Sequence, residues 1–373
     1  MEERGFLAEM ERKENLFRGE NMKKSFAVYP IALIACGMFL IVGAGRVASQ
    51  TSKATSPNQP TREISSLQLQ QQIPVPNVMG RLDHMSSDSK RRLLFVSALG
   101  NNTAEVIDTF AGRVVHTITG LAEPQGILYV PDFNRLVIAN AENGKVNIYD
   151  GTSYELRKSL DFDPDPDNLR WDPTSKLVVV GYGEEEGGIA FIDLTKEERV
   201  GKLLKTGGHP ESFQVETSGG HIFVNCPDAG NVVESIDRKS GEVTKWPLKG
   251  LRGNFPAALD EKDHRLFTVT RKPPMLVVFD TQTGNEIARM RTAGDSDDVF
   301  FDASRKRIYV AGGQASISVY QMNDPDHYSL IEKVPTTIGA RTAYFFVSRD
   351  QLYLGIPAKG SEPSQIWAYG PQE

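Results

Sequence analysis

Short polar clusters recur along this chain of 373 residues, each at the start of an apolar segment. They combine carboxylates, imidazoles, amides and one guanidinium, which are side chains that hold cations or small polar ligands. If the fold brings these clusters together, they form one binding site. The candidate ligand-binding residues are Asp83, His84, Gln125, Asp167, Asn168, His209, Glu211, Asn254, Asp297, Asp298 and Arg341.

Two kinds of ligand suit such a set of residues. One is a divalent cation, because oxygen donors favour Ca²⁺ or Mg²⁺ and imidazole favours Zn²⁺. The other is a small polar ligand, with Arg341 facing an anionic group. In a metal-dependent hydrolase, His84 and His209 are the candidate catalytic bases. The candidate metal ligands are Asn168, Glu211, Asp297 and Asp298.

The spacing of these residues is not by itself a metal signature. Polar side chains at a channel mouth also bond simply to neighbouring backbone and to water. Whether these clusters form one binding site therefore depends on the strands and loops that position them.

Those elements repeat at a near-constant interval. A basic or polar residue followed by Leu or Ile and further apolar residues occurs seven times, at spacings of 41 to 45 residues. A period in this range is typical of four-stranded blades, and seven blades close into a ring. The repeated positions are Leu94, Leu136, Leu177, Ile222, Leu266, Ile308 and Leu352.

Each repeat contains the signals of four short strands. Apolar runs rich in Val, Ile, Phe and Tyr alternate with turn residues, as strands and tight turns require. An apolar residue followed by Asp then precedes a hairpin, as at Ile236-Asp237 and Phe279-Asp280. Each unit is therefore predicted to be strand, turn, strand, loop, strand, hairpin and strand.

The two ends of the repeat region complement each other. The last repeat stops after its third strand, and residues 71–85 resemble residues 332–345, which lead from a fourth strand into the next repeat. We expect residues 67–78 to form the outer strand of the last blade, which removes an open sheet edge. The prediction is an all-β, seven-bladed β-propeller over residues 67–373, with four antiparallel strands per blade. In that fold the polar clusters meet at one mouth of the central channel.

The repeat region resembles the YncE-like, YVTN-repeat β-propellers. Residues 93–118 carry that family's blade pattern of apolar strand, Gly-Asn turn, strand ending in Asp, and Gly hairpin. The resemblance covers about residues 70–373 and implies an exported seven-bladed protein that binds a ligand or partner. The family has no single catalytic motif. Related propellers include lactonases and redox proteins with haem or quinone, which leaves a metal-dependent hydrolase and a redox-associated protein as alternatives.

The N-terminal segment indicates export. Lys23 and Lys24 precede the uncharged residues 25–45, and small residues follow at Val47 and Ser49. This pattern is typical of a secretory signal cleaved near Ser49. The apolar run is also long enough to act as a membrane anchor. We expect a periplasmic or secreted protein, possessing either a cleaved signal or an anchor at residues 25–45, and a flexible linker at residues 50–66.

Two further positions bear on this segment. Cys36 follows a lipobox-like sequence, but the strongly apolar residues after it argue against a lipoprotein. Met22 lies immediately before the lysines and is an alternative start, which would make residues 1–21 a dispensable extension.

Composition excludes several classes of function. The formal charge is −6 and there is no basic run, so the sequence does not indicate nucleic-acid binding. Beyond the signal the single cysteine is Cys226, which leaves no internal disulfide. The sequence has no CxxCH, GxSxG, HExxH or P-loop motif. We expect a monomeric propeller that contacts membrane only through its N-terminal segment.

The remaining aromatic and histidine residues are expected to be structural. The residues predicted to pack between blades are Trp171, Trp246 and Trp367. The residues predicted to lie on outer strands or turns are His116, His264 and His327.

Overall fold

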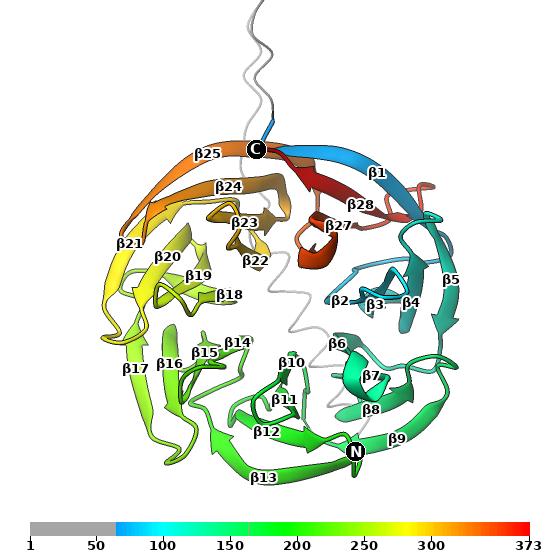
Figure 1. Cartoon of the computed structure of the whole chain (residues 1–373), viewed down its shortest axis with the longest axis horizontal. Coiled ribbons are helices and arrows are strands. Elements are labelled where there is room, and N and C mark those ends of the chain that lie inside the picture. Colours follow the sequence, from blue (N-terminus) through cyan, green and yellow to red (C-terminus); the bar gives the residue numbers. More distant parts are fainter. Residues whose placement is uncertain (1–64, 163) are drawn as a thin grey trace, which may run out of the picture. The chain divides into compact units, whose positions relative to one another are not determined.

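The computed structural model describes residues 65–162 and 164–373. These residues form seven four-stranded antiparallel sheets that stand in a closed ring around a common axis, as Figure 1 shows. Each sheet is one blade, and the chain runs from the innermost strand outward before it enters the next blade. The predicted all-β, seven-bladed propeller with four strands per blade is confirmed.

Six blades are continuous in sequence, and the seventh combines both ends of the propeller. Blade 1 contains β2 (Met85–Asp88), β3 (Leu93–Ala98), β4 (Thr103–Asp108) and β5 (Arg113–Ile118). Blade 2 contains β6 (Pro124–Val130), β7 (Arg135–Asn140), β8 (Lys145–Asp150) and β9 (Leu156–Asp161). Blade 3 contains β10 (Leu169–Asp172), β11 (Leu177–Tyr182), β12 (Gly188–Asp193) and β13 (Glu198–Lys205). Blade 4 contains β14 (Ser212–Val215), β15 (His221–Cys226), β16 (Val232–Asp237) and β17 (Val243–Pro247).

The remaining blades follow the same order. Blade 5 contains β18 (Arg252–Asp260), β19 (Arg265–Lys272), β20 (Pro274–Asp280) and β21 (Glu286–Arg291). Blade 6 contains β22 (Ser296–Asp302), β23 (Arg307–Gly312), β24 (Gln314–Asp324) and β25 (His327–Ile338). Blade 7 contains β26 (Ala343–Phe346), β27 (Gln351–Ile356), β28 (Ser364–Pro371) and β1 (Leu67–Val75). Three short 3₁₀ helices are η1 (Leu99–Asn101), η2 (Pro131–Phe133) and η3 (Val347–Arg349).

The first described strand is the outer strand of the last blade. β1 pairs antiparallel with β28, with Leu67 opposite Pro371 and Val75 opposite Ser364. Just before β1, the backbone amide and hydroxyl of Ser66 both donate to Glu332 on β25. The first and last parts of the propeller therefore share one sheet, and the end of the predicted linker contacts blade 6.

Aspartate side chains stabilise the hairpins between the third and fourth strands. Asp150 Oδ1 accepts hydrogen bonds from the backbone amides of Thr152 at 2.8 Å and Ser153 at 3.0 Å. The same arrangement recurs at Asp108, Asp237 and Asp280. Such a carboxylate replaces the hydrogen bonds that a turn leaves unmade, which is why the sequence repeats Asp at this point.

The hydrophobic core consists of apolar layers between neighbouring blades. Trp246 on β17 lies 5.3 Å from the ring of Phe223 and 5.7 Å from that of Phe279, between blades 4 and 5. Trp171 packs between blades 2 and 3, and Trp367 between blades 6 and 7. The predicted interblade role of the three tryptophans is confirmed. The predicted solvent exposure of three histidines is also confirmed, at His116, His264 and His327.

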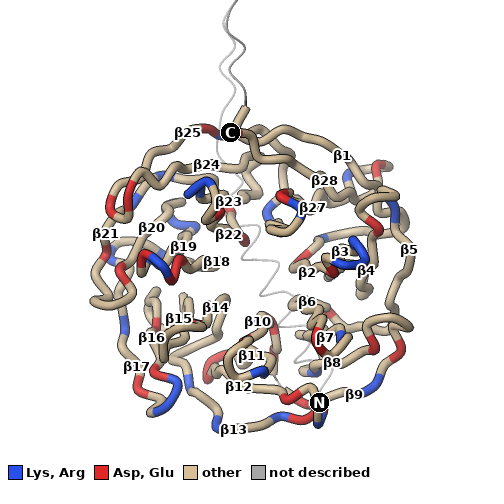
Figure 2. The backbone as a smooth tube through the Cα atoms, viewed as in Figure 1, with Lys and Arg blue, Asp and Glu red and all other residues tan. Residues whose placement is uncertain are grey.

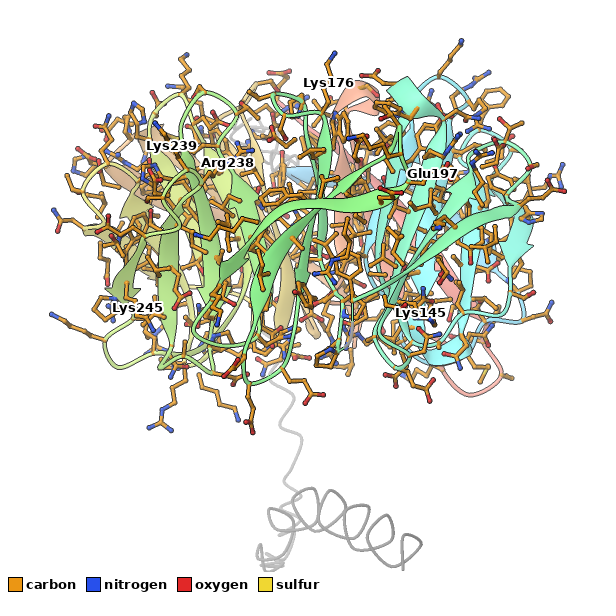
Figure 3. All side chains as sticks on the ribbon, turned by 90° about the horizontal axis from the view of Figure 1, so that it is seen from below. Lys145, Lys176, Glu197, Arg238, Lys239 and Lys245 are labelled. Carbon is orange, nitrogen blue, oxygen red and sulfur yellow. The ribbon has the colours of Figure 1, made fainter. Side chains whose placement is uncertain are left out.

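Different connections lie at the two ends of the strands. Hairpins between the first and second and between the third and fourth strands lie at one end, which Lys176 and Lys239 mark in Figure 3. Loops between the second and third strands, and the connections between blades, lie at the other end, near Lys145. The residues that precede each innermost strand therefore gather at this second end.

Among the described residues, no helix combines the length and apolarity needed to cross a membrane. The predicted signal or anchor at residues 25–45 lies outside the described residues, as does the linker up to residue 64.

Candidate functional site

The connections that lead into the innermost strands enclose a cavity of about 460 Å³, here called the mouth. Eight carboxylate side chains line it beside two arginines and two histidines, whereas the outer hairpins of the ring carry charges of both signs (Figure 2). The mouth is therefore mainly acidic. Its lining residues are Arg81, Asp83, His84, Gln125, Asp165, Asp167, Glu184, Glu185, His209, Glu211, Asp228, Phe255, Arg271 and Asp297.

Asp167, just before β10, lies between two imidazoles. Its Oδ1 is 3.6 Å from His84 Nε2, and its Oδ2 is 3.8 Å from His209 Nε2. His84 precedes β2 and His209 precedes β14, so these contacts join blades 1, 3 and 4 across the mouth. The other ring nitrogen of His209 contacts the Gly183 carbonyl and lies 3.6 Å from Asp165 Oδ2.

Glu211 places a second carboxylate beside this group. One ligand atom from each of Asp167, His209 and Glu211 lies within 4.8 Å of the others, an arrangement that a single cation can contact. Oδ1 of Asp167 and Oδ1 of Asp83 are buried and have no hydrogen-bond partner among the described residues. A buried acceptor without a donor is unfavourable, and a bound positive charge removes that cost.

With no cation bound, both histidines of the mouth are cationic at neutral pH, and a metal ion can use His209 as a ligand only by displacing its proton. Burial alone lowers the pKa of His84, but its contact with Asp167 and the charge of Asp83 raise the pKa to about 9. The pKa of His209 is raised to about 10, because Asp167 and Asp165 outweigh the effect of burial. With these pKa values, neither imidazole is a ready general base at pH 7.

Several carboxyl groups have raised pKa values because they are buried near other acids. Burial and the charge of Asp167 raise the pKa of Glu211 to about 7. Burial raises the pKa of Asp298 to about 7, and it also raises the pKa values of Asp83 and Asp165. Asp167 differs, because its two histidine contacts outweigh burial and lower its pKa. Glu211 and Asp298 therefore have better pKa values for proton transfer at neutral pH than the histidines do.

Arginines pair with carboxylates at the blade 5 and blade 6 side of the mouth and beside it. Arg271, at the end of β19, is paired with Asp297 and stacks on the ring of Phe255 at 3.7 Å. Arg341 Nη1 donates to Asp295 Oδ1 at 3.0 Å. These pairs partly neutralise Asp295 and Asp297 at the start of β22, which leaves the blade 3 and blade 4 side as the more acidic half.

Backbone geometry fixes the position of Asp167. A Cβ atom at Gly126 would lie 2.0 Å from the Asp167 carbonyl oxygen, so a glycine at the start of β6 permits this close approach. Asp165 has a φ of 47°, in the left-handed region that non-glycine residues seldom adopt. These two features constrain the backbone of residues 165–167.

The structure brings together most of the predicted site residues. Those that line the mouth are Asp83, His84, Gln125, Asp167, His209, Glu211 and Asp297. Asn168 and Asp298 instead line a deeper cavity of about 320 Å³, which shares His84 and Asp297 with the mouth.

Two predicted residues line neither cavity. Asn254 is fully buried, and its Nδ2 donates to the Val232 carbonyl at 2.9 Å and to Asn225 Oδ1 at 3.2 Å. The β18–β19 pairing is irregular between Asn254 and Ala257, and Phe255 lines the mouth in its place. Arg341 is directed to Asp295, so its predicted role toward an anionic ligand has no support from the cavity lining.

The predicted metal-ligand set is also different in the structure. Glu211 belongs to the cluster with Asp167 and His209. Asn168 Nδ2 donates to the Glu211 carbonyl at 2.7 Å, and Asp298 Oδ2 accepts from the Ala343 amide at 2.7 Å. Asp297 is paired with Arg271. These three side chains therefore have partners of their own, and Asp167 and His209 stand in the cluster instead of them.

The sequence prediction missed several residues of the mouth. Glu184, Glu185 and Asp228 come from loops between the second and third strands of their blades, and Arg271 ends a second strand. The signal was the acidic run at residues 184–186 between two strands, since such loops lie at the same end as the connections between blades.

Comparison with known proteins identifies the fold. No protein-family model and no curated protein matches the sequence. A chain of hydrazine synthase from Kuenenia stuttgartiensis is similar in structure, with a TM-score of 0.65 and 16% identity over 78% of this chain and 97% of that one. A chain of a mitotic checkpoint complex gives a TM-score of 0.67 and 14% identity, over 87% and 98%. The chain has the β-propeller fold. At these identities the likeness extends to the fold alone.

The propeller's mouth concentrates charged side chains. It offers one compact group of ligand atoms, several crowded carboxyls and two paired arginines. A positive group bound there relieves the mutual repulsion of the acids and satisfies the unpartnered oxygens.

Proposed function

We propose that this chain is an exported binding protein that holds a small positively charged ligand in the mouth of its propeller. The ligand is a divalent cation or an ammonium group, which share the same requirement for carboxylate oxygens. The observation that carries the proposal is the meeting of Asp167, His209 and Glu211 within 4.8 Å, beside buried carboxylate oxygens that have no donor among the described residues.

The N-terminal sequence and the blade pattern support the rest of this assignment. Lys23, Lys24 and the uncharged residues 25–45 favour export to the periplasm or the cell exterior. The blade pattern favours membership of the YncE-like, YVTN-repeat propellers, whose members mostly bind ligands or partners. A basic side chain of a protein partner presents the same charge as a free ammonium group and is a further occupant of the mouth.

Calorimetric titration of the purified protein tests the proposal. Chlorides of Ca²⁺, Mg²⁺, Zn²⁺ and methylammonium serve as probes. Comparing the three metal ions with methylammonium distinguishes a metal ligand from an ammonium ligand. We expect at least one of them to bind, and Glu211→Gln to weaken that binding about tenfold or more. Glu155→Gln removes an exposed carboxylate and serves as the control, with unchanged affinity expected. Absence of binding by all four probes, or equal binding by Glu211→Gln, would contradict the proposal.

A metal-dependent hydrolase, such as a lactonase, is a second candidate. The observation that favours it is the pair of carboxyls with pKa values of about 7, Glu211 in the cation cluster and Asp298 facing His84 at 4.0 Å. Such groups exchange protons readily at neutral pH. A panel of lactones and esters tests it, with turnover expected to require a divalent cation and to disappear in Glu211→Gln and in Asp298→Asn. Turnover that survives in both variants would assign the activity to another site.

A further inference from the structure

One residue of each innermost strand occupies an equivalent position, facing the axis below the mouth. Each pairs with the third residue of the second strand of its blade, as Arg170 pairs with Val179 and Tyr344 with Tyr353. All seven line the deeper cavity of about 320 Å³. These residues are Ser86, Leu128, Arg170, Gln214, Ala258, Phe300 and Tyr344.

Arg170 is the one charged member of this set. Its guanidinium donates to the carbonyl of Leu169 at 2.9 Å and lies 5.6 Å from the ring of Phe213. Across the described residues, no carboxylate oxygen comes within the 4.0 Å that defines an ion pair with it. Arg81 and Arg271 in the mouth are by contrast each paired with an aspartate. The guanidinium of Arg170 therefore retains donors that the protein does not use.

The surroundings of Arg170 make an unpaired positive charge there unfavourable. Leu128, Phe300 and Tyr344 supply apolar and aromatic surface at the same level of the cavity. Burial lowers the pKa of Arg170, which reports weak solvation of its charge. A partly buried guanidinium between apolar walls is a common arrangement for holding the acid group of a small molecule.

The nearest acid belongs to the level above. Asp298 lies two residues before Phe300 on β22, which places it on the mouth side, and its Oδ2 accepts the Ala343 amide. The deeper cavity borders the mouth, and His84 and Asp297 line both of them. Polar groups thus lie toward the mouth, with Arg170 and the apolar walls below them.

We propose that this deeper cavity binds a small organic anion with an apolar body, an aromatic or short aliphatic carboxylate. Its carboxylate forms a bidentate pair with Arg170, and its apolar part packs against Leu128, Phe300 and Tyr344. The cavity volume of about 320 Å³ suits one aromatic ring with an acid group. This site is separate from the proposed cation site and does not depend on it.

Calorimetry with two matched probes, benzoate and benzyl alcohol, tests the site. Both carry the same ring, and only benzoate carries the charge. We expect benzoate to bind the purified protein at least about tenfold more tightly than benzyl alcohol. Arg170→Gln is expected to remove this difference, while Arg113→Gln on the exposed part of β5 is expected to retain it.

Three outcomes would overturn the proposal: no benzoate binding up to about 10 mM, equal binding of the two probes, or full benzoate affinity in Arg170→Gln. If Arg170→Gln does not fold, as circular dichroism would reveal, the comparison of the two probes on the unaltered protein still decides. Failure here leaves the cation proposal standing, because the titrations in the mouth use different probes and a different variant.

Discussion

At the scale of single residues, Asp172 links three segments at the end of β10. Its fully buried carboxylate accepts hydrogen bonds from the Thr174 amide at 3.0 Å and the Ser175 hydroxyl at 2.5 Å, and it pairs with Arg238 of blade 4. Removing one partner of a buried ion pair leaves the other charge uncompensated. Asp172 therefore stabilises both its own turn and the contact between two blades.

We expect Asp172→Ala to lower the free energy of unfolding by about 3 kcal/mol. Denaturation with urea measures this loss. Asp161→Ala is the control, because Asp161 is exposed and contacts Lys145 at the surface, where little or no change in the free energy of unfolding is expected. Equal effects of the two substitutions would show that Asp172 has no special role.

The same residue makes stability depend on pH. Burial alone raises the pKa of Asp172, but Ser175 and Arg238 outweigh it and lower the pKa below its ordinary value. As the pH falls, Asp172 therefore takes up a proton in the unfolded state before it does so in the folded state. The stabilisation that the ionised Asp172 provides is complete above about pH 4 and is lost as pH falls through the folded-state pKa. We expect the stability difference between the unaltered protein and Asp172→Asn to narrow below about pH 4. Urea titrations across the acidic range measure it, and a difference that stays constant or widens would contradict this reasoning.

At the scale of elements, β1 closes the ring by completing blade 7. Ile73 of this strand is fully buried and packs with Ile366, Ala368 and Phe346. Leu69 of the same strand is 41% exposed. Truncating Ile73 therefore removes core packing, whereas truncating Leu69 alters the exposed face of the same strand. Neither substitution changes the backbone pairing of β1.

We expect Ile73→Ala to destabilise the propeller by about 3 kcal/mol, because it leaves a cavity in the apolar layer between blades 7 and 1. Thermal and urea unfolding measure the effect. Leu69→Ala on the exposed face is the matched control, expected to cost less than about 1 kcal/mol. An Ile73→Ala protein as stable as Leu69→Ala would mean that the outer strand contributes little to closure.

The regular elements were predictable because each repeats a local physical requirement. Asp at the hairpins and alternating apolar strands can be read directly from residues such as Asp237 and Leu266. The sequence could not show in the same way whether Asn254 or Phe255 lines the mouth. It depends on an irregular pairing between β18 and β19, which exchanges the residue that faces the mouth and has no counterpart in the sequence pattern.

At the scale of the whole molecule, closure of the ring brings residues from different repeats together in one cavity. Asp167, His209 and Glu211 were predicted at the mouth because each precedes an innermost strand. Their mutual distances were not predictable, since these depend on how three blades pack. Arg170 was overlooked because one charged residue in a short strand acquires meaning only when other blades place Leu128, Phe300 and Tyr344 at its level.

The most direct test of the central claim is the thermal stability of the whole protein in the presence of cations. A ligand that binds only the folded state stabilises it in proportion to the logarithm of its concentration. We expect the unfolding temperature to rise with Ca²⁺, Mg²⁺, Zn²⁺ or methylammonium, and Asp167→Asn to abolish that rise. If none of these cations shifts the unfolding temperature, or if Asp167→Asn responds as the unaltered protein does, the mouth is not the cation site that its geometry indicates.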